Sequence, residues 1–484
     1  MNNNEFYSLK DKILNNDNIL AALLLLLTIG VVYYTPYLFS QIYFIILIYF
    51  AYQSDKNYFW IAFFFILLDA PGRLFLGGLE EDIRQIPNYT LPGGLSIAFT
   101  DIMTLVLFTK ALKSEKQYKF IFSDHFILLF YYSIFLIIYS YILGLNFGNT
   151  VHLIRIFIPW SLIFILPKIF DKESMENFDK ILFPFVFIAL LTQIHTFVSG
   201  SYLIEIIKMS ESVSSSNLLV AQEQVSRAAS SPYIIFYCFI KSLYYYFSDN
   251  NRFDQIYLFA IAACSILSIF LTATRGWILA FTFILLFVLV KLVRNKYSIQ
   301  FGKATVFTMV IFLFAFNLSP TLKTQTVNTV NRLSTLRALF YGDLTADGTL
   351  SRLDYRGPRV LSKYIEKPIL GWGFSNTFYD YRDQHVGHHT MLLNVGILGF
   401  VILNTILLLI IYQMYNSEET LKVISEHGKG IIIFAISLIA VFIIHSSSRS
   451  FWGFVIPNYA AKLTLILFLF NYSLIAVPAH KNTN

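Results

Sequence analysis

Long apolar stretches separated by short polar segments dominate this sequence. About 14 of them approach or reach the roughly 17–25 residues that an α-helix needs to cross a bilayer. Hydrophobic residues make up 56% of the chain and charged residues only 13%, whereas about a quarter of the residues in soluble domains are charged. This pattern predicts an all-α polytopic membrane protein with about 12–14 transmembrane helices. It excludes a soluble enzyme, a nucleic-acid-binding protein and a disordered scaffold. The predicted spans are 17–34, 38–53, 57–71, 93–112, 121–143, 150–170, 181–199, 231–248, 254–272, 276–292, 303–317, 388–412, 429–446 and 453–473.

The spans divide the chain into three regions. Residues 1–317 hold about 11 helices, including a Ser-rich outer loop at 200–230, and residues 388–484 hold about three. Between them, 318–387 forms one long loop, and loops of this length are usually functional. Apolar residues in that loop recur every third position and predict an amphipathic helix; they are Val327, Val330, Leu333, Leu336 and Leu339.

Lysine and arginine in the short loops predict the orientation. If both termini are cytoplasmic, the inner segments hold 18 Lys and Arg residues and the short outer loops hold 6, as the positive-inside rule requires. The type of cation differs as well: 16 of the 18 inner cations are Lys, whereas the outer face including 318–387 holds 11 Arg and 4 Lys. Because Arg binds phosphate through a planar fork of donors, the outer face is expected to bind an anion. Ordinary salt bridges to outer carboxylates are the alternative interpretation.

Several arginines are candidates for that anion site. Arg275 stands where one span ends and the next begins, between Thr274 and Gly276. A cation at the membrane boundary can simply reach toward water, but the neighbouring hydroxyl and the glycine favour an anion pocket. Arg155, just inside the span at 150–170, and Arg227 in the outer loop 200–230 are further candidates.

A histidine cluster closes the long loop. His385, His388 and His389 fall within five positions at the start of a span. Imidazole acts as a general base near neutral pH, so these residues are the candidate catalytic groups. A zinc site with Asp380 or Asp383 is the alternative, although the crowded spacing matches no standard zinc motif.

The order of these motifs resembles that of the O-antigen ligase and O-antigen polymerase superfamily. The Thr274-Arg275-Gly276 segment is similar to its Ser/Thr-Arg-Gly motif, and a long loop follows two spans later. Arg352 and Arg356, followed by the segment 367–373 (Lys-Pro-Ile-Leu-Gly-Trp-Gly), resemble its Arg…Pro-apolar-Leu-Gly-x-Gly segment. His388, with Leu392, Gly396 and Gly399 after it, resembles its His-Asn-x-x-Leu…Gly-x-x-Gly motif.

The resemblance covers about residues 255–415 and departs from the family pattern at one motif. His389 replaces the expected Asn, and the interval from His388 to Gly396 is short, whereas counting from His385 restores it. His388 therefore ranks first as the catalytic base, because Leu392 has the right offset from it, followed by His385 and then His389.

Membership would imply a membrane glycosyltransferase that works at the periplasmic face of the bacterial inner membrane. Such an enzyme takes a glycan from undecaprenyl diphosphate and transfers it to an acceptor hydroxyl on a glycan, on lipid A-core or on a protein. The resemblance implies no metal or other cofactor. Arg275, Arg352 and Arg356, together with Arg155 and Arg227, would bind the diphosphate or the rest of the substrate. A His base would assist direct attack, which inverts the anomeric carbon.

Two choices stay open from the sequence. It does not separate a ligase from a polymerase. A transporter, such as a flippase for lipid-linked oligosaccharides, is the alternative of a different class. Transporters more often show internal repeats and charges at mid-bilayer, whereas here charge concentrates on the outer face and no repeat is visible.

Overall fold

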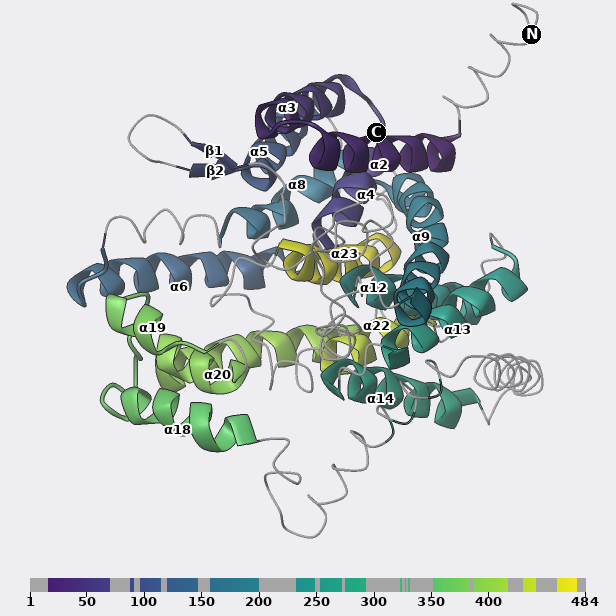
Figure 1. Ribbon diagram of the computed structural model, residues 1–484. Coiled ribbons are helices and arrows are strands. Elements are labelled where there is room, and N and C mark those ends of the chain that lie inside the picture. Colours follow the sequence, from purple (N-terminus) through teal and green to yellow (C-terminus); the bar gives the residue numbers. More distant parts are fainter. Residues whose placement is uncertain are drawn as a thin grey trace, which may run out of the picture. The chain divides into compact units, whose positions relative to one another are not determined.

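Helices make up most of the described part of the computed structural model (Figure 1). The structure describes residues 16–69, 88–90, 96–114, 120–146, 157–199, 232–248, 253–271, 275–292, 323, 327, 330, 351–383, 386–416, 430–440 and 459–476. The chain divides into two units, the first comprising 1–117 and 165–241 and the second 118–164 and 242–484.

The first unit is a group of helices, of which the first three are joined by short turns. Asn16 caps α2, because its side chain accepts the backbone N–H groups of Asn18 and Ile19 and so satisfies donors that a helix start leaves open. Pro36 directly precedes α3. The only strands among the described residues form a small antiparallel hairpin in this unit. The elements are α2 (Asp17–Tyr34), α3 (Tyr37–Gln53), α4 (Asn57–Asp69), β1 (Asn88–Thr90), β2 (Ser96–Ala98), α5 (Phe99–Lys113), α9 (Lys172–Ser199) and the first part of α12 (Pro232–Phe247).

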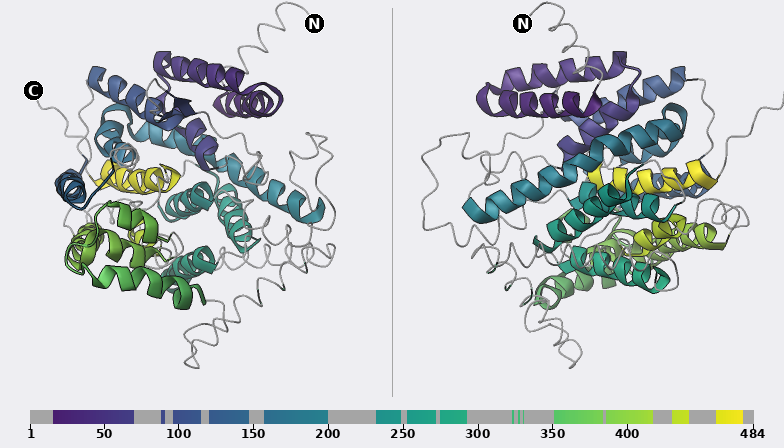
Figure 2. Two further views of the ribbon diagram at one scale, coloured as in Figure 1. Left: turned by 60° about the vertical axis from the view of Figure 1, so that its left-hand side comes forward. Right: turned by 90° about the vertical axis from the view of Figure 1, so that its right-hand side faces the viewer.

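The second unit contains the long-loop helices and the C-terminal spans. In both Figure 1 and Figure 2, α18, α19 and α20 lie side by side, and α18 packs on α20. The elements are α6 (Ser123–Ile142), η1 (Ile158–Ser161), α13 (Gln255–Leu271), α14 (Arg275–Leu292), α18 (Ser351–Ile365), α19 (Asn376–Tyr381), α20 (Gly387–Asn416), α22 (Gly430–Ile439) and α23 (Tyr459–Ala476). Helix α8 (Leu162–Ile169) begins in this unit and ends in the first.

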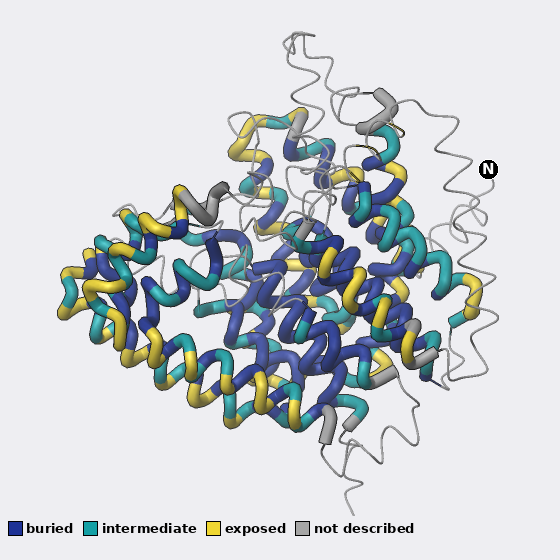
Figure 3. Tube along the Cα trace, turned by 90° about the horizontal axis from the view of Figure 1, so that it is seen from below, coloured by how far each residue is buried: buried dark blue, intermediate teal, exposed yellow. Residues whose placement is uncertain are grey.

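Many helices bury one face and expose another, as the alternating colours in Figure 3 show, and exposed residues are often apolar. In α3, Phe44 and Leu47 are buried, whereas Leu38 and Phe39 are 62% and 59% exposed. Water would disfavour such extended apolar exposure, but lipid accommodates it. The exposed faces therefore fit a membrane protein.

Most described helices overlap predicted spans, but the predicted span 93–112 contains strand β2, and its helix α5 begins only at Phe99. Three described helices are long and apolar enough to cross a membrane: Ser123–Ile142, Lys172–His195 and Gly387–Met414. Seven shorter apolar segments accompany them in the described part of the chain. The predicted span 303–317 and loop 200–230 lie outside the described residues, as does nearly all of the predicted amphipathic helix; of its stripe, only Val327 and Val330 are described, and both are exposed.

The first unit also buries a charged pair within its helices, in addition to the charges that the sequence concentrates in its loops. Lys241 Nζ of α12 lies 3.0 Å from Asp179 Oδ2 of α9, and both side chains are at most 2% exposed. Tyr237 donates a 2.8 Å hydrogen bond to the other oxygen of Asp179. The two charges are paired and hydrogen-bonded, as burial in an apolar setting requires.

Candidate functional site

The site begins at a break in α20. Gly396 has a φ of 65°, which interrupts the helix and separates a short leading part, 387–395, from 397–416. The later part alone has about the 20 residues that a span needs. The rings of His388 and Phe400 meet edge-on, with centroids 5.8 Å apart. In an unbroken helix these positions would be separated by roughly 18 Å of rise, so the break brings the candidate base over the start of the span.

The Pro-Ile-Leu-Gly-Trp-Gly segment of the long loop fills this break. Interrupting a helix frees backbone groups, and leaving them unpaired in an apolar setting costs free energy. Four backbone hydrogen bonds between the segment and α20 satisfy them: Trp372 N to Leu393 O (2.8 Å), Gly373 N to Asn394 O (2.8 Å), Ile397 N to Pro368 O (2.8 Å) and Leu398 N to Ile369 O (3.1 Å). The segment and the broken helix therefore form one structural element.

Two glycines make this close approach possible. Gly371 has a φ of 69°, and a Cβ there would lie 2.5 Å from the backbone nitrogen of Gly396. A Cβ on Gly396 would lie 2.2 Å from the carbonyl oxygen of Ile369. Side chains are excluded at both positions by conformation and by space.

Helix α6 holds the same element from the other side. Tyr139 donates its hydroxyl to the carbonyl oxygen of Gly371 at 3.2 Å, and Tyr132 donates to that of Val395 at 3.3 Å. The buried Ser140 hydroxyl accepts the backbone N–H of Phe374 at 2.7 Å. These residues recur at i, i+7 and i+8, so they lie on one face of α6.

A stripe of cations runs along α18. Arg352, Arg356, Arg359 and Lys363 are separated by four, three and four residues, which puts their helix positions on one face. Arg356 Nη1 lies 3.5 Å from Asp383 Oδ1, and Arg359 Nη2 lies 3.9 Å from Asp383 Oδ2. One carboxylate thus faces two guanidinium groups, which remain 46% and 51% exposed.

The backbone of Asp383 is held by the start of α20. Thr390 Oγ1 donates to the carbonyl oxygen of Asp383 at 2.6 Å and accepts its N–H at 3.2 Å. A Cβ on Gly357 of α18 would lie 3.4 Å from the His389 ring. The half-buried imidazole of His389 therefore packs against α18 beside the helix position of Arg356.

The structure brings three of the sequence-predicted residues into one region, namely His388, His389 and Arg356. Arg275 starts α14 and Arg352 lies in the first turn of α18; their side chains are not among those described. His385, Arg155 and Arg227 lie outside the described residues. Within the described part of the chain, no group of three or more His, Cys, Asp or Glu side chains is placed to hold a metal ion.

Sequence reasoning missed Arg359 and the α6 hydroxyls, and it considered Asp383 only as an alternative zinc ligand. A usable signal existed for Arg359, because its spacing from Arg352 and Arg356 continues a helical stripe. No comparable signal marks Ser140 or Tyr139, since their partners are backbone atoms more than 200 residues away.

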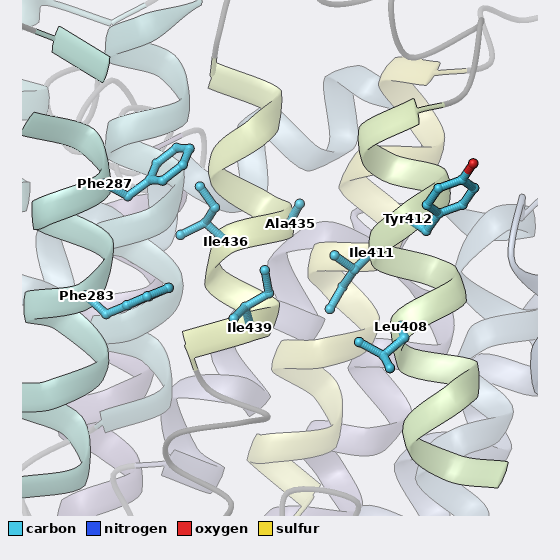
Figure 4. A pocket seen from close by; sticks show the side chains of 8 residues that line it. All are labelled: Phe283, Phe287, Leu408, Ile411, Tyr412, Ala435, Ile436 and Ile439. Carbon is cyan, nitrogen blue, oxygen red and sulfur yellow. The ribbon is translucent and has the colours of Figure 1, made fainter. Parts of the chain in front are cut away.

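An apolar groove of about 530 Å³ lies farther along α20 in the same unit. Its α20 residues follow Phe400 by 8 to 12 positions, roughly 12–18 Å of helix rise. The Tyr412 hydroxyl points away from the other lining side chains (Figure 4). The groove therefore suits an aliphatic chain. It is lined by Phe283, Phe287, Leu408, Ile411, Tyr412, Ala435, Ile436 and Ile439.

Comparison with known proteins shows a family likeness over part of the chain. Residues 260–404 match the family model described as O-antigen ligase, which spans less than a third of the chain. The match confirms the sequence-based resemblance to the O-antigen ligase superfamily over this segment. Neither a curated protein nor a solved structure gives a significant match. The matched segment contains α14, α18, α19 and the break in α20, but not α6.

Proposed function

We propose that the chain transfers a glycan from undecaprenyl diphosphate to an acceptor hydroxyl at the periplasmic face of the bacterial inner membrane. The match to the O-antigen ligase family supports glycan transfer of the ligase or polymerase type in general. The more specific proposal rests on one observation: a candidate general base and candidate diphosphate-binding groups lie together in the second unit. The half-buried imidazole of His389 on α20 lies against the helix that carries the Arg356 and Arg359 guanidinium groups. His388 precedes His389 in the chain.

Arg356 and Arg359 are suited to bind the leaving diphosphate. Their single shared carboxylate leaves the group with net positive charge, and about half of each side chain is exposed. As the bond between the anomeric carbon and the diphosphate oxygen breaks, the electron pair goes to that oxygen. Guanidinium donors placed beforehand stabilise this developing charge. Arg275 and Arg352 are proposed to contribute to the same site.

An imidazole is suited to take the acceptor proton. The acceptor oxygen attacks the anomeric carbon from the side opposite the diphosphate, so the configuration inverts. Its proton passes to the ring nitrogen of the base. We assign this role first to His388, whose ring is oriented by Phe400. His389, which packs against Gly357, would link the base to the arginine helix. No step calls for a metal.

The apolar groove is proposed to receive part of the lipid tail, because all its lining groups are apolar apart from the outward Tyr412 hydroxyl. The acceptor would be a glycan, lipid A-core or a protein. A flippase-type transporter is the competing function. The buried pair in the first unit does not favour it, because Lys241 and Asp179 neutralise each other.

A transfer assay with purified lipid-diphosphate glycan and acceptor, in the presence of EDTA, tests the proposal. His388→Ala should lower the transfer rate by roughly 10²–10⁴-fold, and His389→Ala should lower it less. Arg356→Lys keeps the charge but loses the fork, so it should raise the KM for the donor. Full activity of both His388→Ala and His389→Ala would refute the assignment of the base. Activity that EDTA abolishes and zinc restores would replace this account with a metal site.

A further inference from the structure

We infer that the C-terminal end of α18 and the segment around Trp372 form a subsite for an acidic sugar residue of the transferred glycan. This inference rests on the proposed function and names its substrate class. Two lysines and two aromatic rings, Lys363, Lys367, Trp372 and Tyr381, are gathered there in one unit.

The indole of Trp372 is fixed in place. Its ring N–H donates a 2.8 Å hydrogen bond to the carbonyl oxygen of Lys363, and its backbone N–H is bonded to Leu393 in the break of α20. Leu393 follows His388 by five residues, which is roughly 7 Å of helix rise. The rigid ring therefore lies within about one or two sugar units of the candidate base.

The lysine ammonium groups surround this ring. Lys363 Nζ lies 4.9 Å from the centroid of Trp372 and 5.4 Å from that of Tyr381, and Lys367 Nζ lies 5.1 Å from that of Trp372. Such contacts hold the cations over the ring faces. The rings offer large apolar surfaces with polar edges, which match the apolar C–H faces and polar rims of sugar rings.

The charge balance favours an anionic sugar over a neutral one. Glu366 pairs with Lys363 at 2.7 Å but is itself 50% exposed. Among the described residues, the Lys367 ammonium has the Trp372 ring and no carboxylate as its partner. A sugar carboxylate would supply the missing anion and form a charge-assisted hydrogen bond. A hexuronate fulfils both requirements if its carboxylate draws the Lys367 ammonium away from the Trp372 ring, so that the sugar ring can lie against that ring.

Equilibrium binding to the purified full-length protein tests the subsite. The probes are a trisaccharide of galacturonic acid and, as the neutral control, the trisaccharide of galactose. The acidic probe should bind about tenfold more tightly, and this advantage should fall with added salt. Lys367→Gln should remove most of it, whereas Lys367→Arg should retain it. Lys323→Gln, at an exposed position elsewhere in the same loop, should behave as the wild type.

Three outcomes would overturn the inference: equal affinity for both trisaccharides, no measurable binding of either, or an acidic preference that survives in Lys367→Gln. Because binding requires no turnover, this measurement can be made whether or not the protein is a transferase. An inactive protein with this selectivity would refute only the transferase, and an active one without it would refute only the subsite. Competition by the acidic trisaccharide against the lipid donor or against the acceptor then shows which glycan supplies the acidic residue.

Discussion

Replacing Gly371 with alanine should separate the loop segment from the broken helix. The added Cβ would lie 2.5 Å from the nitrogen of Gly396 and 2.6 Å from the carbonyl oxygen of Asn394. Both are backbone atoms, so a rotamer change cannot relieve the overlap. The left-handed conformation alone costs about 1–2 kcal/mol for a residue with a Cβ. Displacing the segment would also unpair buried backbone groups, at about 1–3 kcal/mol each.

If two of the four backbone bonds are lost, the folded state should be destabilised by about 3–8 kcal/mol, enough to open the segment locally. Hydrogen exchange measures this directly. The amides of Trp372, Gly373, Ile397 and Leu398 should lose protection in Gly371→Ala, and transfer activity should fall with it.

Two control variants separate the backbone strain of Gly371→Ala from its steric overlap. Gly144 has a φ of 85° but nothing within 4 Å of its Cβ position, so Gly144→Ala should show conformational strain only, about 1–2 kcal/mol. Gly30 lies in α2 with a free Cβ position, and Gly30→Ala should be neutral or slightly stabilising. Unchanged protection of all four amides in Gly371→Ala would refute the proposed union of loop and helix.

Three further predictions concern other parts of the chain. Asp383→Asn removes the carboxylate that Arg356 and Arg359 share. Inorganic pyrophosphate should therefore bind about 3–10-fold more tightly, while the turnover rate falls. Weaker pyrophosphate binding would contradict this, and Asp380→Asn is the control variant. Ser140→Ala leaves the buried N–H of Phe374 without its acceptor and should lower the free energy of unfolding by about 1–3 kcal/mol. The Ser133 hydroxyl bonds within α6, so the control Ser133→Ala should lower that free energy clearly less. Equal losses in the two variants would show that the hydrogen bond from Ser140 to the loop adds no stability. An impermeant thiol reagent should label Ser351→Cys in intact cells but Ser417→Cys only after permeabilisation; the reverse pattern would place the loop in the cytoplasm and refute the periplasmic reaction.

Hydropathy predicted the positions of the helices well because apolar run length directly reflects the need to span a bilayer. The first predicted span, 17–34, coincides with α2. Prediction was poorer where a helix carries charge. The span expected at 181–199 is helical from Lys172, since Asp179 in its polar first turns is compensated by Lys241 on another helix. Hydropathy treats each residue alone and cannot register such a pair.

The site was predictable in its residue types but not in its construction. Motif order pointed to His388, His389 and Arg356, which the structure brings to one region. The span expected at 388–412 is not one straight helix, because Gly396 breaks it. A glycine inside an apolar run has several structural explanations. Only the distant segment 368–374, which supplies the missing hydrogen bonds, distinguishes a break from a helical glycine.

The broken helix gives a physical reason why the loop motif and the span motif belong together. An apolar helix that is interrupted needs partners for its freed backbone groups, and the segment 368–374 supplies them through Trp372, Gly373, Pro368 and Ile369. The same segment is continuous with α18 on one side and α19 on the other, so docking it also positions the arginine helix beside His389. Helix α6, outside the family-matched residues, then secures the docked segment through Tyr139 and Ser140. Glycan transfer requires a fixed separation between the base and the arginines that bind the diphosphate. The backbone hydrogen bonds between the loop and the broken helix maintain this separation, so it does not depend on side-chain contacts alone.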